Sequence, residues 1–147
     1  MREIKFRAKD YQTNKWVYGF LFMGKGDDNR DYAFILQDKG LKVGTAAEDN
    51  AIEFTYDEAH LVNKETICQF TGLRDKNGKE IYEGDIVQSL SEKKGYVAFL
   101  QQEMGYVVVW DSCDTRLGHR ARGGGYDHDL SLEVIGNIYD NPKLVER

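Results

Sequence analysis

Apolar and polar residues alternate in short segments along most of the chain. Near the N-terminus, Ile4, Phe6 and Ala8 alternate with charged residues, as in a strand with one buried face. The segment 16–22 has aromatic or apolar residues at nearly every position, which is typical of a strand that is apolar on both faces. Turn-forming residues separate the two segments, so the pattern predicts a hairpin.

The period of two residues recurs further along the chain. A turn at residues 38–40 favours a second hairpin with a bulge, and residues 57–61 are expected to form one helical turn. Asn77-Gly78 predicts a tight hairpin turn with positive φ at both positions. Short strands separated by turns, without a long amphipathic helix, indicate an all-β sandwich or small barrel. Further strands are predicted at residues 32–36, 41–43, 52–56, 67–71, 79–82, 86–90, 96–100, 106–110 and 130–139.

Composition restricts the class of protein. Hydrophobic residues make up 41% of the 147 residues and charged residues 31%, so the chain can form a core. The net charge of −5 opposes bulk electrostatic coating of nucleic acid. The longest apolar run is far shorter than a membrane span, and the N-terminal segment lacks the apolar run of a signal peptide, so we expect a cytoplasmic protein. In that compartment Cys68 and Cys113 are expected to be free thiols, with Cys68 in the core.

The segment 111–129 is predicted to be a long irregular loop that contains several metal-binding residue types. Cys113, His119 and His128 are too widely spaced for a compact zinc site, and only Asp127 and Asp129 flank His128 closely. Neither a phosphate-binding loop nor a serine nucleophile motif is present. We therefore predict no catalytic residues, no metal site and no cofactor. A metal-dependent hydrolase built on these histidines and aspartates is kept as a second alternative.

Two basic features suggest a candidate binding surface. On a regular first strand, Lys5, Arg7 and Lys9 share one face, which would suit phosphates or an acidic protein surface. The long loop adds arginines and an aromatic residue that suit single-stranded nucleic acid, although four aspartates surround them. The loop residues are Arg116, Arg120, Arg122 and Tyr126.

Several motifs at both ends of the chain resemble the YopX protein family of bacteriophages and prophages. They are FTGLRDKNGKEIYEGDIV at residues 70–87, the opening MREIKFRAKD, WVYG at residues 16–19, and EVIGNIYDNPKL at residues 133–144. The resemblance implies a phage or prophage origin and a small SH3-like β-barrel over roughly the second half of the chain. It implies no activity and no catalytic residues.

Together these observations predict an all-β chain with an N-terminal β region over residues 1–64 and an SH3-like barrel over residues 65–147. We expect a non-enzymatic binding module whose partner is a host or phage protein and which also associates with itself, because acidic charge and many aromatic residues suit protein contacts. Single-stranded nucleic-acid binding through the basic residues is the first alternative. The candidate aromatic anchors are Tyr11, Trp16, Tyr18, Tyr82, Tyr96, Tyr106 and Trp110, most of which are expected in the core.

Overall fold

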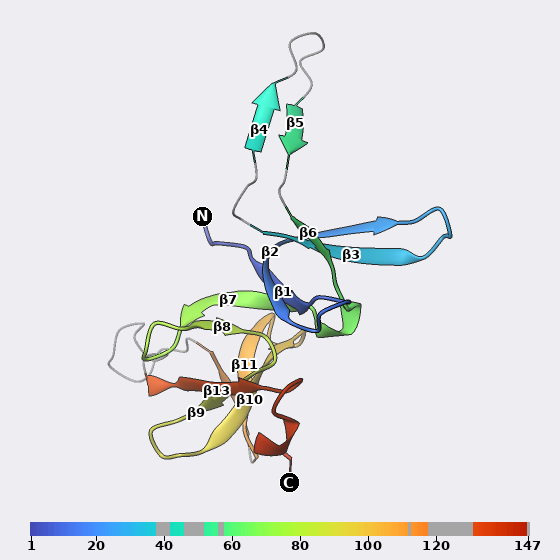
Figure 1. Ribbon diagram of the computed structural model, residues 1–147. Helices are drawn as coiled ribbons and strands as arrows, with labels where there is room; N and C mark the ends of the chain where they lie inside the picture. The colour runs from blue at the N-terminus through green and yellow to red at the C-terminus, as the bar shows by residue number, and fades with distance from the viewer. Residues whose placement is uncertain (38–41, 46–51, 56–57, 112, 118–130, 147) are drawn as a thin grey trace. The chain divides into compact units, whose positions relative to one another are not determined.

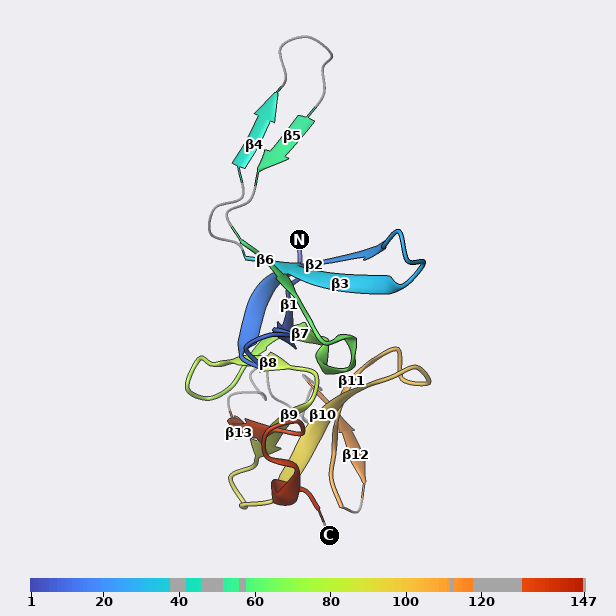
Figure 2. The same ribbon diagram turned by 45° about the vertical axis from the view of Figure 1, so that its right-hand side comes forward.

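The protein is mainly β, as predicted, and its strands pair antiparallel (Figures 1 and 2). The computed structural model describes residues 1–37, 42–45, 52–55, 58–111, 113–117 and 131–146. The chain divides into two compact units: the N-terminal unit is Ile4–Cys68, and the C-terminal unit is Gln69–Arg147 together with Met1–Glu3.

The N-terminal unit contains a sheet in which neighbouring strands run in the order β6-β3-β2-β1. A separate two-stranded ladder joins β4 to β5. The helix η1 (Lys64–Thr66) follows β6, and its residue Thr66 accepts a hydrogen bond of 2.8 Å from the backbone N–H of Lys9. The strands are β1 (Phe6–Lys9), β2 (Trp16–Lys25), β3 (Asp31–Leu36), β4 (Lys42–Thr45), β5 (Ile52–Thr55) and β6 (Ala59–Leu61).

One face of this sheet forms the core of the N-terminal unit. Ala8 on β1 lies opposite Val17 on β2, which confirms the predicted first hairpin. Successive side chains of a strand point to opposite faces. The residues that directly precede and follow Ala8 on β1 and Val17 on β2 therefore lie on the outer face of the sheet. The buried core residues are Ala8, Val17, Ala33, Ile35 and Val62.

Two predictions for the N-terminal unit are wrong. The segment predicted as a helical turn contains strand β6, because residues 59–61 pair with β3. The predicted second hairpin, with its turn at residues 38–40, is not formed. Instead β3 pairs with β2 and β6, whereas β4 pairs with β5. Both errors have the same cause: local turn residues do not reveal pairing with a strand that lies further along the chain.

The C-terminal unit contains a five-stranded antiparallel sheet with the order β12-β11-β10-β9-β13 and a hairpin of β7 with β8. In the described residues no pairing closes this sheet into a barrel. The predicted long loop includes one short strand, β12, and residues 118–130 lie outside the described residues. The elements are β7 (Cys68–Arg74), β8 (Glu80–Tyr82), β9 (Asp85–Gln88), β10 (Lys94–Leu100), β11 (Gly105–Val109), β12 (Asp114–Arg116), β13 (Glu133–Asn137) and η3 (Pro142–Leu144).

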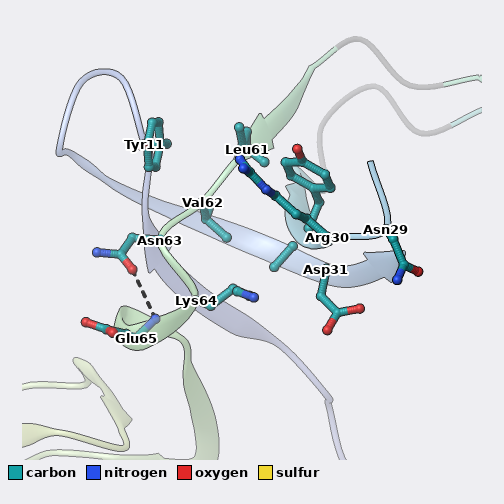
Figure 3. A pocket seen from close by; sticks show the side chains of 11 residues that line it. Tyr11, Asn29, Arg30, Asp31, Leu61, Val62, Asn63, Lys64 and Glu65 are labelled. Atoms are coloured by element: carbon teal, nitrogen blue, oxygen red, sulfur yellow. Dashed lines mark hydrogen bonds between the residues drawn. The ribbon is translucent and has the colours of Figure 1, made fainter. Parts of the chain in front are cut away.

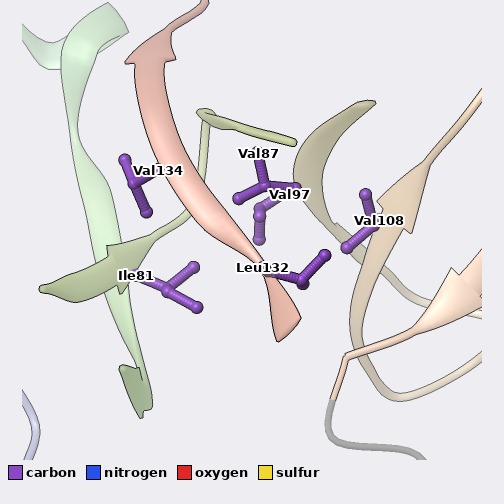
Figure 4. Packing of buried hydrophobic residues seen from close by; sticks show 6 residues of the cluster. All are labelled: Ile81, Val87, Val97, Val108, Leu132 and Val134. Atoms are coloured by element: carbon purple, nitrogen blue, oxygen red, sulfur yellow. The ribbon is translucent and has the colours of Figure 1, made fainter. Parts of the chain in front are cut away.

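Aliphatic side chains from five segments form the core of the C-terminal unit (Figure 4). They come from alternate positions of strands predicted by the period of two residues, which is why each strand contributes one or two of them. Trp110 and Tyr106 pack against this cluster from partly buried positions. The cluster consists of Ile81, Val87, Val97, Val108, Leu132 and Val134.

The turn between β7 and β8 is built around the buried carboxylate of Asp75, which is 1% exposed. Asp75 Oδ1 accepts hydrogen bonds from the backbone N–H groups of Asn77 (2.8 Å) and Lys79 (2.9 Å). The predicted tight turn is present, but positive φ at both positions is wrong. Gly78 has a φ of 79°, whereas Asn77 keeps a negative φ, because Asp75 at the first position favours a type I turn followed by a left-handed glycine.

Asp75 also connects this turn to β13. Its Oδ2 accepts a hydrogen bond of 3.0 Å from the backbone N–H of Val134, and the backbone N–H of Lys76 donates to Leu132 O at 2.9 Å. Burial raises the pKa of Asp75, but the three backbone hydrogen bonds outweigh it and hold the pKa below the usual range for a carboxyl group. The charged form of Asp75 is therefore a structural element of the C-terminal unit.

Neither Cys68 nor Cys113 forms a disulfide, and Cys68 is buried, both as predicted; Cys113 is exposed. Of the helices that the structure describes, none has the length and apolar character needed to cross a membrane.

Candidate binding surface

The outer face of the N-terminal sheet carries a row of aromatic side chains on β2. The residues of this row alternate with Val17 and Gly19, whose positions on the other face are buried. Tyr18 is 45% exposed, Phe20 is 44% exposed and Phe22 is 62% exposed. Large apolar side chains exposed next to one another on a folded protein usually mark an interaction surface.

Strand β3 extends this row sideways. Phe34 lies opposite Phe22, and Leu36 lies opposite Phe20. Directly opposed residues of antiparallel strands share a face of the sheet, so both half-buried side chains join the row. We call Tyr18, Phe20, Phe22, Phe34 and Leu36 the aromatic face.

Two of the predicted basic residues lie at the β1 end of the aromatic face. Arg7 is opposite Tyr18, and Lys9 is opposite Trp16. The Arg7 Cζ atom lies 4.7 Å from the centre of the Trp16 ring, and Lys9 Nζ lies 5.6 Å from it, within the range of cation–π contacts. Arg7 is only 5% exposed, so it has little surface to offer a phosphate. Lys5 precedes β1 and is half-buried.

The second basic feature belongs to the C-terminal unit. Arg116 lies on β12, where its Nε donates a hydrogen bond of 2.7 Å to Glu103 Oε2 and its Nη2 lies 2.6 Å from the same oxygen. This ion pair offsets the charge of Arg116. The other predicted residues of this feature, Arg120, Arg122 and Tyr126, lie outside the described residues.

The expectation that most of the aromatic anchors lie in the core is wrong, because only one of the seven is fully buried. Tyr11 is 72% exposed and Tyr18 is 45% exposed, while Tyr82 is 2% exposed in the core. The remaining four, Trp16, Tyr96, Tyr106 and Trp110, are half-buried. Sequence reasoning missed Phe20 and Phe22 as surface residues. The signal was the apolar character of both faces of the segment 16–22, since a sheet in a small unit covers only one of its faces.

A hollow of about 600 Å³ lies where β3 passes β6 and η1 (Figure 3). Tyr32 and Leu61 line it, and Leu61 lies opposite Phe34 of the aromatic face. Asn63 Oδ1 accepts a hydrogen bond of 3.1 Å from the backbone N–H of Glu65, which caps η1 at the rim. The lining combines cations with anions, so the hollow has no dominant charge. The charged lining residues are Arg30, Asp31, Lys64 and Glu65.

His60 on β6 pairs with a carboxylate that lies far away in the sequence. Its Nδ1 lies 2.8 Å from Asp10 Oδ2, and its Nε2 lies 3.3 Å from Glu58 Oε2. Asp10 Oδ1 accepts further hydrogen bonds from the backbone N–H groups of Thr13 (2.8 Å) and Gln12 (2.9 Å). This arrangement fastens the β1–β2 turn to β6, so it has a structural role.

The Asp10 carboxyl group is expected to make the N-terminal unit sensitive to acid. The hydrogen bond from the Thr13 backbone, followed by that from His60, lowers the pKa of Asp10 from 3.8 to about 2, although burial opposes the shift. A lowered pKa contributes stability that is present above the ordinary pKa and is lost as the pH falls toward about 2. The stability advantage of the natural chain over Asp10→Asn should therefore shrink over this range.

The measurement is the urea midpoint of both proteins, followed by Trp16 fluorescence in a Trp110→Phe background from about pH 6 to about pH 2. These are the two tryptophans of the chain, so this background reports on the N-terminal unit. A constant difference between the two midpoints across this range would contradict the role assigned to Asp10.

Metal-binding residue types do not cluster in the part of the chain that the structure describes: no group of three His, Cys, Asp or Glu side chains is placed to hold an ion there. His119, Asp127, His128 and Asp129, on which the hydrolase alternative depends, lie outside the described residues.

These features define a small, mainly β protein of two compact units with an exposed aromatic surface on one of them. The chain belongs to the YopX protein family, whose model matches residues 5–146. Its fold is similar to that of protein EF1440 from Enterococcus faecalis, known from a crystal structure, with a TM-score of 0.61 and 24% sequence identity over 99% of this chain and 100% of that chain. The comparison with curated proteins found no match.

Proposed function

We propose that this protein is a phage or prophage accessory protein that acts as a non-enzymatic binding module for a host or phage protein. The observation that carries the proposal is the exposure of Tyr18, Phe20 and Phe22 side by side on the aromatic face. Aromatic residues are enriched in the cores of protein interfaces, because they bury a large area with few rotatable bonds.

Charge favours a protein partner over nucleic acid. Binding to phosphates needs several cations that are free to displace counterions. Arg7 is buried, Arg116 is paired with Glu103, and the whole chain carries a net charge of −5. The β2–β3 turn adds Asp27 and Asp28 near the far end of the aromatic face.

Single-stranded nucleic acid is the alternative partner, and one observation favours it. Lys9 and Trp16 lie on the same face of the sheet as Tyr18 and Phe20, and bases stack on such aromatic platforms. This alternative requires affinity that falls steeply with salt, because counterions are released on binding.

The test is capture of partners by the tagged protein from its host, with and without nuclease. The double variant Tyr18→Ser with Phe20→Ser should capture at least tenfold less of the partner than the natural chain does, because it removes the apolar area that the partner would cover. Leu90→Ser is the matched control, because Leu90 is a large apolar residue that is 78% exposed in the C-terminal unit. Leu90→Ser should capture as much of the partner as the natural chain does.

A protein that resists nuclease and is lost only in the double variant supports the proposal. Capture that disappears with nuclease moves the assignment to nucleic acid. Equal capture by the natural chain and the double variant overturns the role of the aromatic face. Near-identical urea midpoints for all the proteins would exclude misfolding as the cause of a loss.

We also propose that the C-terminal unit is an SH3-like barrel and that the protein acts in the cytoplasm. The short antiparallel strands of the unit and their small aliphatic core support the barrel assignment. The free, exposed thiol of Cys113 suits a reducing compartment.

A further inference from the structure

A hollow of about 390 Å³ lies in the C-terminal unit, at one end of the five-stranded sheet. The segments that join β9 to β10 and β11 to β12 border it, and both lie at this end because neighbouring strands run antiparallel (Figure 2). Trp110 directly follows β11, two residues after the core residue Val108, so it lies on the face of the sheet that carries the core. The hollow therefore begins where the aliphatic core ends.

The indole of Trp110 is held in place as one wall of this hollow. A Cβ atom at Gly95 would be 2.8 Å from Trp110 Cε3, so the ring packs closely on the backbone of β10. Trp110 Nε1 donates a hydrogen bond of 2.8 Å to Thr115 Oγ1 on β12. The side chain is half-buried and lines the hollow, so it offers a ligand an aromatic surface of fixed orientation.

Positive charge predominates in the lining of the hollow. Lys93 and Lys94 are exposed there, and neither forms an ion pair with another described residue. They stand against the single carboxylate of Asp111. An ammonium group has three hydrogen-bond donors and no acceptor, so the two lysines suit an anion.

The hydroxyl groups of the lining add further donors. Thr115 Oγ1 accepts the hydrogen bond from Trp110, and its own proton has no acceptor among the described residues. The hydroxyl oxygens of Ser89 and Ser91 lie 3.0 Å apart. Whichever of the two accepts this hydrogen bond keeps its own proton for another acceptor. A ligand rich in acceptor oxygens would therefore satisfy the hollow.

We propose that this hollow binds a nucleoside monophosphate, with the phosphate group beside Lys93 and Lys94 and the base against the indole of Trp110. Phosphate oxygens accept hydrogen bonds from ammonium and hydroxyl groups. Every base has a flat face that stacks on an aromatic side chain. The volume of about 390 Å³ lies in the range of small-molecule sites, about 300–1,000 Å³.

The phosphate and base have two sources, a free nucleotide or the phosphorylated end of a single strand. Either ligand binds to the C-terminal unit, whereas the aromatic face belongs to the N-terminal unit. The site is therefore additional to the surface that we assign to a protein partner.

The test is isothermal titration calorimetry of the purified full chain with adenosine 5′-monophosphate, adenosine and inorganic phosphate. Adenosine 5′-monophosphate should bind at least about tenfold more tightly than adenosine or phosphate, because stacking and charge-assisted hydrogen bonds both contribute. In a Trp16→Phe background, where Trp110 is the one remaining tryptophan, the same nucleotide should quench its fluorescence as the base stacks on the ring.

The double variant Lys93→Gln with Lys94→Gln should raise the dissociation constant for adenosine 5′-monophosphate at least about tenfold, because it removes both cations. Lys79→Gln with Lys143→Gln is the matched control. It removes the same charge from two exposed lysines of the same unit that do not line the hollow, and it should leave the constant unchanged. Urea midpoints followed by Trp110 fluorescence check that both double variants are folded.

The proposal is overturned if adenosine 5′-monophosphate does not bind at millimolar concentration. Equal affinities for the nucleotide and inorganic phosphate would also overturn it, because they indicate an anion site without a place for the base. Equal affinities of the two double variants would overturn it as well, because they place binding outside the hollow.

A single-stranded oligonucleotide, with and without a 5′-phosphate, distinguishes the two sources. Tighter binding of the phosphorylated strand than of both the unphosphorylated strand and the free nucleotide supports the site and assigns it to strand ends. Binding of the free nucleotide at least as tight as that of the phosphorylated strand supports the site and assigns it to free nucleotides. These measurements use the purified protein alone, so their outcome is independent of the capture experiment for a partner protein.

Discussion

Asp75→Ala is expected to lower the free energy of unfolding of the C-terminal unit by about 3 kcal/mol or more, because a buried donor without an acceptor costs about 1–3 kcal/mol. The substitution removes the acceptor of three backbone N–H groups, those of Asn77, Lys79 and Val134. Asp75 is 1% exposed, so water does not replace the carboxylate without opening the turn. The loss would separate the β7–β8 turn from β13.

The measurement is urea unfolding followed by Trp110 fluorescence in a Trp16→Phe background, which reports on the C-terminal unit. Asp114→Ala is the matched control, because it removes an exposed carboxylate of the same unit and should change the free energy by less than about 0.5 kcal/mol. Asp75→Asn retains one acceptor oxygen and should fall between the two. An Asp75→Ala midpoint close to that of Asp114→Ala would contradict the structural role of the carboxylate.

Gly19→Ala is expected to destabilise the N-terminal unit by about 3 kcal/mol or more, from overpacking and backbone strain together. A Cβ atom on Gly19 would lie 1.9 Å from Leu36 O, a backbone atom that cannot rotate away. The φ of Gly19 is 155°, which residues with a side chain rarely adopt. Relief would require β2 to move away from the end of β3, with loss of the packing between them.

Gly24→Ala provides a matched control on the same strand. A Cβ atom there would meet only the Phe22 ring, at 3.9 Å, which is an ordinary van der Waals contact. The free energies of unfolding are compared by Trp16 fluorescence in a Trp110→Phe background. Gly24→Ala should resemble the natural chain, and equal midpoints for the two glycine variants would show that β2 and β3 are not as close as described.

The positions of most strands could be predicted from the sequence alone. The alternation around Phe6 and Ala8 marks β1, and the aromatic segment 16–22 marks β2. Local hairpins were also predictable: β1 pairs with β2, and β7 pairs with β8 across the turn at Asn77-Gly78. In a strand with one buried face, apolar residues recur at every second position. A short turn brings neighbouring strands together, so both signals lie within a few residues of sequence.

Pairing over longer distances was not predictable. The residues of β6 looked like a helical turn because their strand character depends on β3, more than twenty residues earlier in the chain. The separate ladder of β4 with β5 likewise replaced an expected pairing of β4 with β3. Interactions between distant segments carry no local pattern, since each segment is compatible with several partners.

The candidate surface likewise combines features that the sequence predicts with features that depend on the tertiary structure. The sequence by itself determined that β2 is apolar on both faces and that Arg7 and Lys9 share a face of β1. Only the tertiary structure decided that Val17 enters the core while Phe22 remains exposed, and that Arg7 is buried beside Trp16. Alternation along a strand is a property of the covalent chain, whereas the covered face depends on elements that reach the sheet from elsewhere in the sequence.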